Sequence, residues 1–246
     1  MGLLLSSAYL APVHYYTKLY SSALAQVRSG GTEGLIIEEQ ADHYVKQTYR
    51  NRCIIAGDDG PIALTVPVTA PNHTPMHSVL ISDHGDWRRQ HWNAIVSAYR
   101  SSPYFEYYAD DFSTIFHDET ALLVDFNAAL RDFILDSLDL HPQIVVNREQ
   151  YIKFDSTPKA SCLPNETSSQ HAGAPSLLGR AGGEASDFRE TIRPKIPYTF
   201  DPTFRPVPYW QVFAHRHGFQ PNLSIIDLLF NMGPESRIIL RDSLVM

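Results

Sequence analysis

The chain has 246 residues, a formal net charge of −7 and 43% hydrophobic residues. This composition is typical of a globular protein and excludes a fibre or a disordered tail. The acidic balance argues against broad nucleic-acid binding, which needs clustered Lys and Arg to displace phosphate counterions. Cys53 and Cys162 are the only cysteines, and their separation argues against a zinc site. No apolar run approaches the ~18 residues of a membrane span, so we expect a cytoplasmic protein without one.

The N-terminal part of the chain predicts a strand, a helix and a second strand. Leu3–Ala8 is an apolar run of strand length, and Gly34–Glu38 is another. Between them, Val13–Val27 carries apolar and aromatic residues at helical spacing and stops at a pair of glycines. A strand, a helix and a strand at this spacing indicate a βαβ unit with two parallel strands.

The central part predicts a hairpin and then mainly helices. Two apolar runs, Cys53–Ala56 and Ile62–Val68, flank a turn rich in Gly and Asp, which is typical of a β-hairpin. The expected helices cover Asp83–Tyr99, with Asp83 as its cap, Tyr104–Ile115 and Glu119–Leu138, and a further strand is expected at Gln143–Val146.

The composition changes after this strand. Pro158–Ser186 is rich in Ser, Gly, Ala and Pro and has little periodicity, which indicates a flexible surface insertion. A last helix is expected at Ser224–Met232. The elements together predict an α/β fold with a Rossmann-like mixed sheet flanked by helices, a hairpin and the insertion, in a single domain of residues 1–246.

One segment, residues 44–52, combines cations, phenols and an amide just before the hairpin. Lys46, Arg50 and Arg52 are its cations, and Asn51 supplies the amide. Arg offers a planar fork for phosphate or carboxylate, and Lys offers a mobile point charge. The segment suits a nucleotide, a sugar phosphate or a carboxylate. The alternative is a solvated strand edge whose charges discourage aggregation.

Two histidines are candidates for proton transfer. His14 lies where the first strand meets its helix, beside Tyr9, and ligands of open α/β sheets bind just beyond the strand carboxyl ends. A structural role is the alternative for a single His at a helix start. His91 shares a helix face with Trp87, four residues earlier, and could face a cleft or satisfy a buried carbonyl.

Motifs for metals and common cofactors are absent. His73 and His77 are four residues apart, but Pro75 between them argues against a helix that would align them. The sequence contains no P-loop, catalytic triad or dinucleotide fingerprint in a strand–helix context. We therefore assign no metal site, and the cofactor stays unknown.

A series of motifs follows in a characteristic order. It comprises Tyr9…Pro12…Tyr15-Tyr16, Tyr44-x-Lys46…Tyr49-x-Asn51-Arg52, Leu64-Thr-Val-Pro67-Val, Trp87…His91…Tyr99-Arg100…Pro103-Tyr-Phe105 and Tyr209-x-Gln211…Asn222-Leu-Ser224-Ile-x-Asp227-Leu-Leu-Phe-Asn231-x-Gly233. In this order the motifs resemble the bacterial WbqC-like protein family, above all its Bacteroidetes branch, over residues 3–157 and 187–240. Pro158–Ser186 departs from longer-known members, which carry a Tyr-Leu-Ser-Gly-like run there. The opening also resembles nucleotidyltransferase-type Rossmann folds, without their His-x-Gly-His signature.

The resemblance implies a role in O-antigen or other surface-polysaccharide biosynthesis. Family members are associated with such gene clusters, and a glycine-transferase role has been suggested. It thus implies a transferase that moves an acyl or aminoacyl group to a sugar, with a nucleotide-sugar or sugar phosphate as substrate. For this role we expect His14, His91 and Asp227 as the catalytic residues. The expected substrate-binding residues are Tyr9, Lys46, Arg50, Asn51, Arg52, Tyr99 and Tyr104. The alternative is a non-catalytic nucleotide-sugar-binding or scaffold protein.

Overall fold

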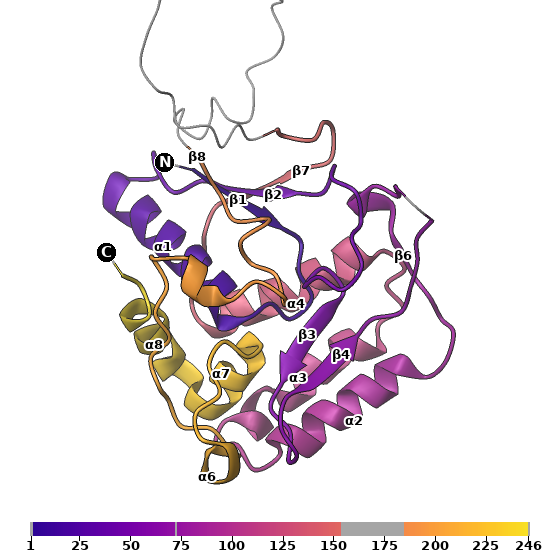
Figure 1. Ribbon diagram of the computed structural model, residues 1–246, viewed down its shortest axis with the longest axis vertical. Helices are drawn as coiled ribbons and strands as arrows, with labels where there is room; N and C mark the ends of the chain where they lie inside the picture. Colours follow the sequence, from indigo (N-terminus) through magenta and orange to yellow (C-terminus); the bar gives the residue numbers. More distant parts are fainter. Residues whose placement is uncertain (1, 72, 154–184, 246) are drawn as a thin grey trace, which may run out of the picture.

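A parallel sheet stands at one end of the molecule in the computed structural model, which describes residues 2–71, 73–153 and 185–245 (Figure 1). Its strands are β1 (Gly2–Ser6), β2 (Ile36–Glu39), β7 (Ile144–Asn147) and β8 (Ala185–Asp187). Their order is β7-β2-β1-β8, and every neighbouring pair is parallel. The expected α/β fold with a βαβ opening is confirmed.

Strand β1 lies inside the sheet, with β2 on one side and β8 on the other. The chain passes from β1 through α1 (Val13–Ser29) to β2 on one side of β1, whereas β8 pairs with the other side of β1. In the register, Leu3 lies opposite Ile36 of β2 and Ser186 of β8. The strand order therefore changes direction between β1 and β8.

Two antiparallel ladders lie outside the parallel sheet. The expected hairpin is formed by β3 (Arg52–Ile55) and β4 (Ile62–Thr65), and β5 (Val68–Thr69) pairs with β6 (Leu80–Ile81). The remaining elements are α2 (Trp87–Tyr99), α3 (Phe105–His117), α4 (Leu123–Ser137), α6 (Ala214–His217), α7 (Ile225–Met232), α8 (Ser236–Asp242) and the 3-10 turns η1 (Met76–Ser78), η2 (Tyr198–Phe200) and η3 (Gly233–Glu235).

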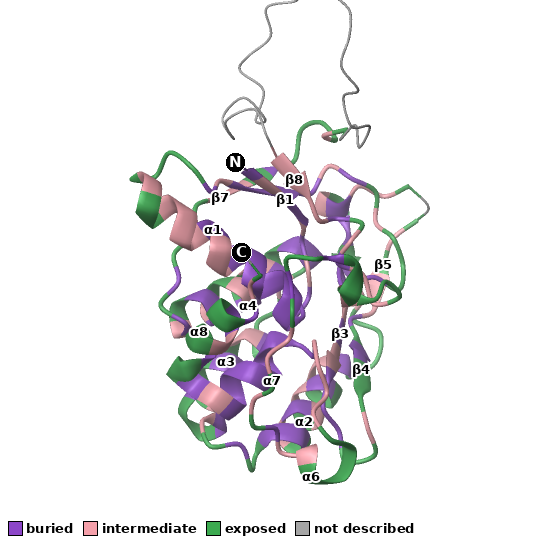
Figure 2. Ribbon diagram, turned by 60° about the vertical axis from the view of Figure 1, so that its left-hand side comes forward, coloured by how far each residue is buried: buried purple, intermediate pink, exposed green. Residues whose placement is uncertain are grey.

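The core is organised around α7. Every residue from Ile225 to Asn231 is buried, including the polar Asp227 and Asn231, so the helix is enclosed by the rest of the protein (Figure 2). One cluster of buried apolar side chains extends from Leu5 of β1 to Leu240 of α8. The described helices include none that is long and apolar enough to cross a membrane.

Two expectations about element boundaries are wrong. Asp83 does not cap α2, because that helix begins at Trp87 after Asp86 and has no side-chain cap hydrogen bond. The expected insertion at 158–186 ends too late, because Ala185 and Ser186 belong to β8 and pair with β1. Residues 158–184 of that segment lie outside the described part of the chain.

Candidate functional site

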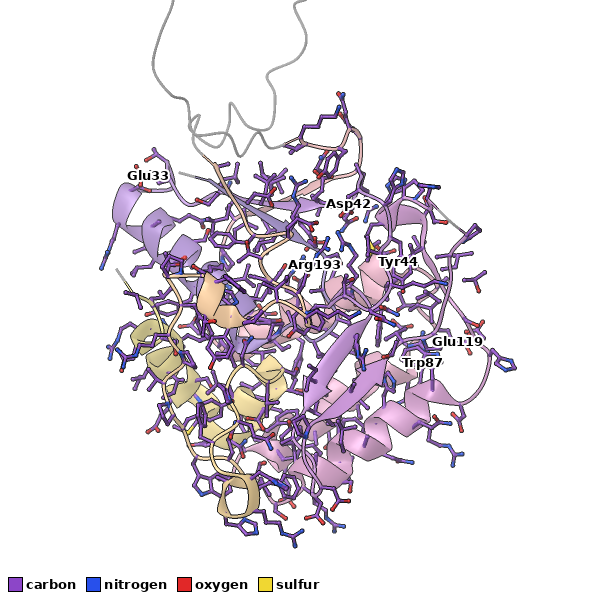
Figure 3. The ribbon with its side chains drawn as sticks, in the orientation of Figure 1. Glu33, Asp42, Tyr44, Trp87, Glu119 and Arg193 are labelled. Atoms are coloured by element: carbon purple, nitrogen blue, oxygen red, sulfur yellow. The ribbon has the colours of Figure 1, made fainter. Side chains whose placement is uncertain are left out.

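A pocket lies at the carboxyl end of the sheet, between β1 and β8. In open parallel sheets, ligands bind beyond the strand carboxyl ends where the strand order changes direction. Here that place holds the residues that follow β1 and the segment that follows β8 (Figure 3, where Arg193 is labelled). The polar part of the lining comprises Ser6, Ser7, Thr48, Arg50, Arg189 and Arg193. Among the described lining residues, arginines are the only charged ones.

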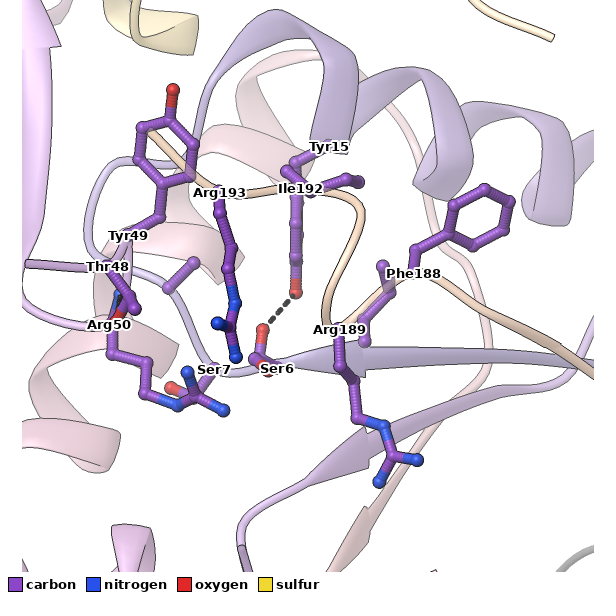
Figure 4. A pocket seen from close by; sticks show the side chains of 12 residues that line it. Ser6, Ser7, Tyr15, Thr48, Tyr49, Arg50, Phe188, Arg189, Ile192 and Arg193 are labelled. Atoms are coloured by element: carbon purple, nitrogen blue, oxygen red, sulfur yellow. Dashed lines mark hydrogen bonds between the residues drawn. The ribbon is translucent and has the colours of Figure 1, made fainter. Parts of the chain in front are cut away.

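Two of these guanidinium groups converge. Figure 4 shows Arg50 and Arg193 directed toward the turn at Ser6 and Ser7, whereas Arg189 points away from it. Arg50 forms a buried ion pair with Asp42, and Arg193 pairs with the exposed Glu190. The Nε atoms of both arginines and the Oγ atom of Ser6 are buried without a hydrogen-bond partner in the described structure. Such donors suit an anion, because a guanidinium edge matches the oxygens of phosphate and carboxylate.

The turn that follows β1 is held from two sides. The hydroxyl of Tyr15, on α1, donates to the backbone oxygen of Ser6 at 3.1 Å. The amide of Asn127, on α4, donates to Ser7 Oγ at 3.2 Å and to the backbone oxygen of Arg50 at 2.8 Å. The part of the pocket lined by Ser6 and Ser7 is therefore held in place without a ligand.

Arg189 pairs with carboxylates of the sheet, on β8 and β2. Its Nε and Nη2 atoms donate to the two carboxylate oxygens of Asp187 at 2.9 and 2.6 Å, and Nη1 lies 3.4 Å from Oε2 of the fully buried Glu39. Glu39 also accepts hydrogen bonds from Asn147 at 3.0 Å. This network joins the ends of β2, β7 and β8 and leaves Arg50 and Arg193 as the arginines facing the turn.

The N-terminus of α1 is already occupied. The backbone N–H of Val13 donates to the oxygen of Leu223 at 3.0 Å, and that of His14 donates to Oδ1 of Asn222 at 2.9 Å. In dinucleotide-binding folds the first helix offers such groups to a phosphate. Here the segment before α7 uses them, so an anion at this sheet edge would depend on arginine side chains.

The pocket is narrow in this conformation. Its free volume of about 10 Å³ corresponds to a single water position. Arg193 has 26% of its side chain exposed and its ion-pair partner is on the surface, so it can turn outward at little cost. Entry of a ligand would therefore move Arg193 first.

Comparison with known proteins shows the family to which this chain belongs. The model of the WbqC-like protein family matches residues 32–239, which is most of the chain. The chain belongs to the WbqC-like protein family. It is also similar to an uncharacterized protein of Mycobacterium tuberculosis, with 28% identity over 205 residues that cover 80% of this chain and 84% of the relative. The match to the family covers β2, the hairpin and the helical core but begins after β1 and α1.

The basic segment of this WbqC-like chain is divided among different surroundings. Arg50 lines the pocket, whereas Lys46 is exposed to solvent. Asn51 donates from its amide to the backbone oxygen of Val66 at 2.8 Å and so holds the hairpin. Arg52 is half-buried on β3. Arg50 is thus the cation of the segment that the fold brings to the sheet edge, next to Thr48 and Tyr49.

Tyr9 and His91 meet in the aromatic core. The hydroxyl of Tyr9 and Nδ1 of His91 are joined by a hydrogen bond of 2.9 Å, and the Tyr9 ring stacks on Phe126. Trp87 meets the His91 ring edge-on at 5.1 Å between centroids. Burial lowers the pKa of His91 to about 4, so it is neutral near pH 7. Neither residue lines the sheet-edge pocket.

His14 lies in a separate buried cluster. Its Nε2 is 2.7 Å from Oδ2 of Asp201, which also pairs with Lys18, and its ring stacks on Phe204 at 4.5 Å. Burial lowers the pKa of His14, although its hydrogen bond with Asp201 acts in the opposite direction. His14 is 1% exposed and does not line the pocket.

The remaining predicted residues lie farther along the fold. Tyr99 is fully buried and its hydroxyl accepts the N–H of Ala56 at 3.0 Å. Asp227 accepts hydrogen bonds from Tyr209 at 2.6 Å and from Gln211 at 2.8 Å. Tyr104 lines a groove between α3 and α4. The structure therefore distributes the predicted site residues over several places.

Sequence reasoning identified Arg50 but missed Ser6, Ser7, Arg189 and Arg193 of the pocket. Ser6 and Ser7 lie near the end of the strand predicted at Leu3–Ala8, and the rule that ligands bind beyond strand carboxyl ends could have identified them. Arg189 and Arg193 are four residues apart, directly after β8. Their position at the sheet edge could not be predicted, because β8 is a three-residue strand at the end of a Ser- and Gly-rich stretch. No cluster of potential metal ligands occurs among the described residues.

Proposed function

We propose that this protein binds the phosphate or carboxylate of a small-molecule substrate at the carboxyl edge of its parallel sheet. The observation that carries the proposal is the convergence of Arg50 and Arg193 on the Ser6–Ser7 turn, each with a buried and unpaired Nε atom. A buried guanidinium edge without a partner is costly, and an anionic oxygen would satisfy it.

The bound anion would belong to the substrate of a transfer reaction. In that reaction an acyl or aminoacyl group, candidates for which include glycine, is transferred to a sugar of surface-polysaccharide biosynthesis. A nucleotide-sugar or sugar phosphate supplies both the anion for the arginines and the acceptor. Such compounds are metabolites of the cytoplasm, which is where we propose that the protein acts. Membership of the WbqC-like family is consistent with this role.

A non-catalytic binding protein of the same pathway is the second candidate, and one observation favours it. The described pocket lining contains Ser, Thr, Tyr and Arg but no His, Asp, Glu, Lys or Cys. Burial raises the pKa of Tyr49 to about 12, so its phenol is a poor general base near pH 7. Proton transfer would therefore need a group from the substrate or from outside this lining.

The binding proposal is tested by titrating the purified protein with phosphate, a sugar 1-phosphate, a uridine diphosphate-linked sugar and glycine. Calorimetry and thermal unfolding are the measurements. A ligand at a hundred times its Kd raises the unfolding free energy by about 2.7 kcal/mol. We expect Arg193→Gln to weaken binding at least about tenfold, because a charge-assisted hydrogen bond contributes about 1.5–3 kcal/mol. Arg89→Gln, which removes a guanidinium 72% exposed on α2, is the matched control and should change nothing.

Arg50 needs a paired substitution, because its loss alone would strand the buried Asp42. The double variant Arg50→Gln/Asp42→Asn keeps a neutral hydrogen-bonded pair and should lose ligand affinity while still folding. Unchanged affinity in this variant and in Arg193→Gln would contradict the proposal. Mass spectrometry of sugar products after incubation with glycyl and acyl donors then separates the two candidates. Binding without any product would favour the non-catalytic protein.

A further inference from the structure

A groove on the opposite part of the fold has the composition of a cation site. It lies between α3 and α4, has a volume of about 890 Å³ and is also lined by Pro234 of η3. Aromatic rings and carboxylates make up most of its lining, and no Lys, Arg or His is among the described lining residues. None of these residues takes part in the sheet-edge pocket.

The helical period places the aromatic side chains on facing surfaces. Tyr104, Tyr107 and Tyr108 stand three and four residues apart at the start of α3, and Phe133 faces them from α4. The Tyr108 ring is perpendicular to Tyr107, with centroids 4.8 Å apart at 89°, and to Phe133, with centroids 6.4 Å apart at 87°. The rings thus form walls at right angles, as in an aromatic cage.

The aromatic rings that line the groove differ in exposure. Tyr108 is 6% exposed, whereas Tyr107 is 80% exposed although its ring is large and mostly apolar. A Cβ atom on Gly233 would lie 2.5 Å from the Tyr104 ring, so glycine is what lets that ring rest on the backbone of η3. The Tyr107 ring can therefore be reached by a ligand from solvent.

Each helix adds one carboxylate to the groove. Asp111 of α3 and Asp136 of α4 both line it and are exposed, and Asp136 has His141 as a neighbour at 3.9 Å. The charge of the groove is therefore negative around electron-rich ring faces. Both features attract the same kind of ligand, because cations bind over aromatic faces and pair with carboxylates.

From this complementarity we infer that the groove between α3 and α4 binds a small organic ammonium ion. The ammonium group would sit over the exposed Tyr107 ring, which the buried Tyr108 ring supports edge-to-face, with Asp111 and Asp136 in the same lining. The ligand class is a small primary amine or a quaternary ammonium compound. The inference does not depend on the proposed function, because it uses other residues on other elements.

The test compares a cation with its neutral isostere. Choline and ethanolamine are titrated calorimetrically, and 3,3-dimethylbutan-1-ol, in which carbon replaces the quaternary nitrogen, serves as the reference. We expect choline or ethanolamine to bind, and the neutral alcohol to bind at least about fivefold more weakly, since each cation–π contact contributes about 0.5–1 kcal/mol at an exposed site. Failure of both ammonium compounds to bind, or equal binding of the alcohol, would overturn the inference.

Variants locate the binding. Tyr107→Ala should weaken ammonium binding about twofold to fivefold, and Tyr107→Phe should largely preserve it. The double variant Asp111→Asn/Asp136→Asn should weaken it by a similar factor, whereas Asp110→Asn/Asp132→Asn removes two exposed charges from the same helices outside the groove and should not. These positions are exposed, so the variants should fold.

The outcomes also distinguish an ammonium site in the groove from general charge attraction, from a peptide-docking surface and from the sheet-edge pocket. Equal losses in the two double variants would mean general charge attraction and would contradict a groove site. Tighter binding of a tetralysine peptide than of ethanolamine, lost in Tyr107→Ala, would make the groove a docking surface for a basic segment and overturn the small-molecule assignment. Arg193→Gln should leave ammonium binding unchanged, whatever its effect at the sheet edge.

Discussion

The sheet-edge pocket and the cluster of His14, Lys18 and Asp201 hold similar kinds of side chain in opposite states. In the cluster, Asp201 accepts from His14, from Lys18 and from the backbone and hydroxyl of Thr203 at 2.9 and 2.7 Å. In the pocket, Arg193 has a buried Nε atom with no partner in the described structure. The cluster is complete as it stands, whereas the pocket has donors left for a ligand.

The comparison shows that residue type does not identify a site by itself. A histidine beside an aspartate suggests general-base chemistry, yet here both belong to a saturated network that packs α1 against the segment around Thr203. Buried polar groups that are fully hydrogen-bonded contribute to structure. A buried group with an unmade hydrogen bond is available to a substrate where it also lines a pocket, as Arg50 and Arg193 do. The predictions below separate the two states.

The largest expected effect is that of Asp201→Ala. This change leaves the Lys18 ammonium, 3% exposed, without its carboxylate and removes the acceptor of His14. Breaking one partner of a buried ion pair costs about 3–5 kcal/mol, so we expect the unfolding free energy in urea to fall by that amount.

Asp201→Asn is the control for that change, because it keeps an oxygen acceptor and loses only the charge. Its loss of stability should be smaller than that of the alanine variant. A loss below about 1 kcal/mol in Asp201→Ala would mean that the cluster does not hold the fold. Ligand affinity at the sheet edge should survive in whatever fraction remains folded.

A second prediction contrasts Asp201 with Asp227. Although burial opposes it, hydrogen bonds from His14, Lys18 and Thr203 hold the pKa of Asp201 well below its usual range. None of the described hydrogen-bond partners of Asp227 is a cation. Burial raises the pKa of Asp227 to about 6, against the effect of its hydrogen bonds with Tyr209 and Gln211. The folded state thus binds a proton at Asp227 more tightly than the unfolded state does. Its contribution to stability is present below pH ~4 and is lost as the pH rises to about 6.

The measurement is the unfolding free energy at pH values between 4 and 7 for the parent protein and Asp227→Asn. A shift of about two pKa units corresponds to ~3 kcal/mol, which the parent should lose relative to the variant across this range. The asparagine keeps an oxygen for Tyr209 and Gln211. Parallel pH profiles for the two proteins would contradict the raised pKa of Asp227.

The smallest expected effect on stability is that of Arg193→Gln. Its only ion-pair partner in the described structure is Glu190, whose side chain is 68% exposed, and such pairs contribute about 0–1 kcal/mol. We expect the unfolding free energy to change by less than about 1 kcal/mol while ligand affinity falls as proposed above. A large loss of stability without ligand would place Arg193 in the same structural class as Asp201.

Most of the elements were predictable from the sequence because their signals are local. The helix expected at Val13–Val27 is α1, which ends at Gly30 with φ 64°, a conformation that glycine adopts at no cost. The hairpin at β3 and β4 follows from the Gly- and Asp-rich turn between them. Strand β8 was not predictable, because three residues carry no periodicity and only the pairing with β1 makes them a strand.

The candidate site was predictable only in part. Arg50 belongs to the segment that the sequence marks for anion binding, and it lines the pocket. Arg193, the other arginine directed toward the turn, lies far along the chain, after β8, so no local pattern connects it with Arg50. The roles expected for His14 and His91 stay predictions, and the structure places these residues in separate buried networks.

What the sequence determined by itself is what depends on neighbours in the chain: helical spacing, turn chemistry, the alternation of strands and helices, and the motifs of the WbqC-like family. The tertiary structure alone decided which charged and polar groups are satisfied. Hydrogen-bond saturation depends on distant partners, such as Asp201 for His14 and Asn222 for the start of α1. It is this saturation, settled by long-range packing, that leaves Arg50 and Arg193 with donors to spare.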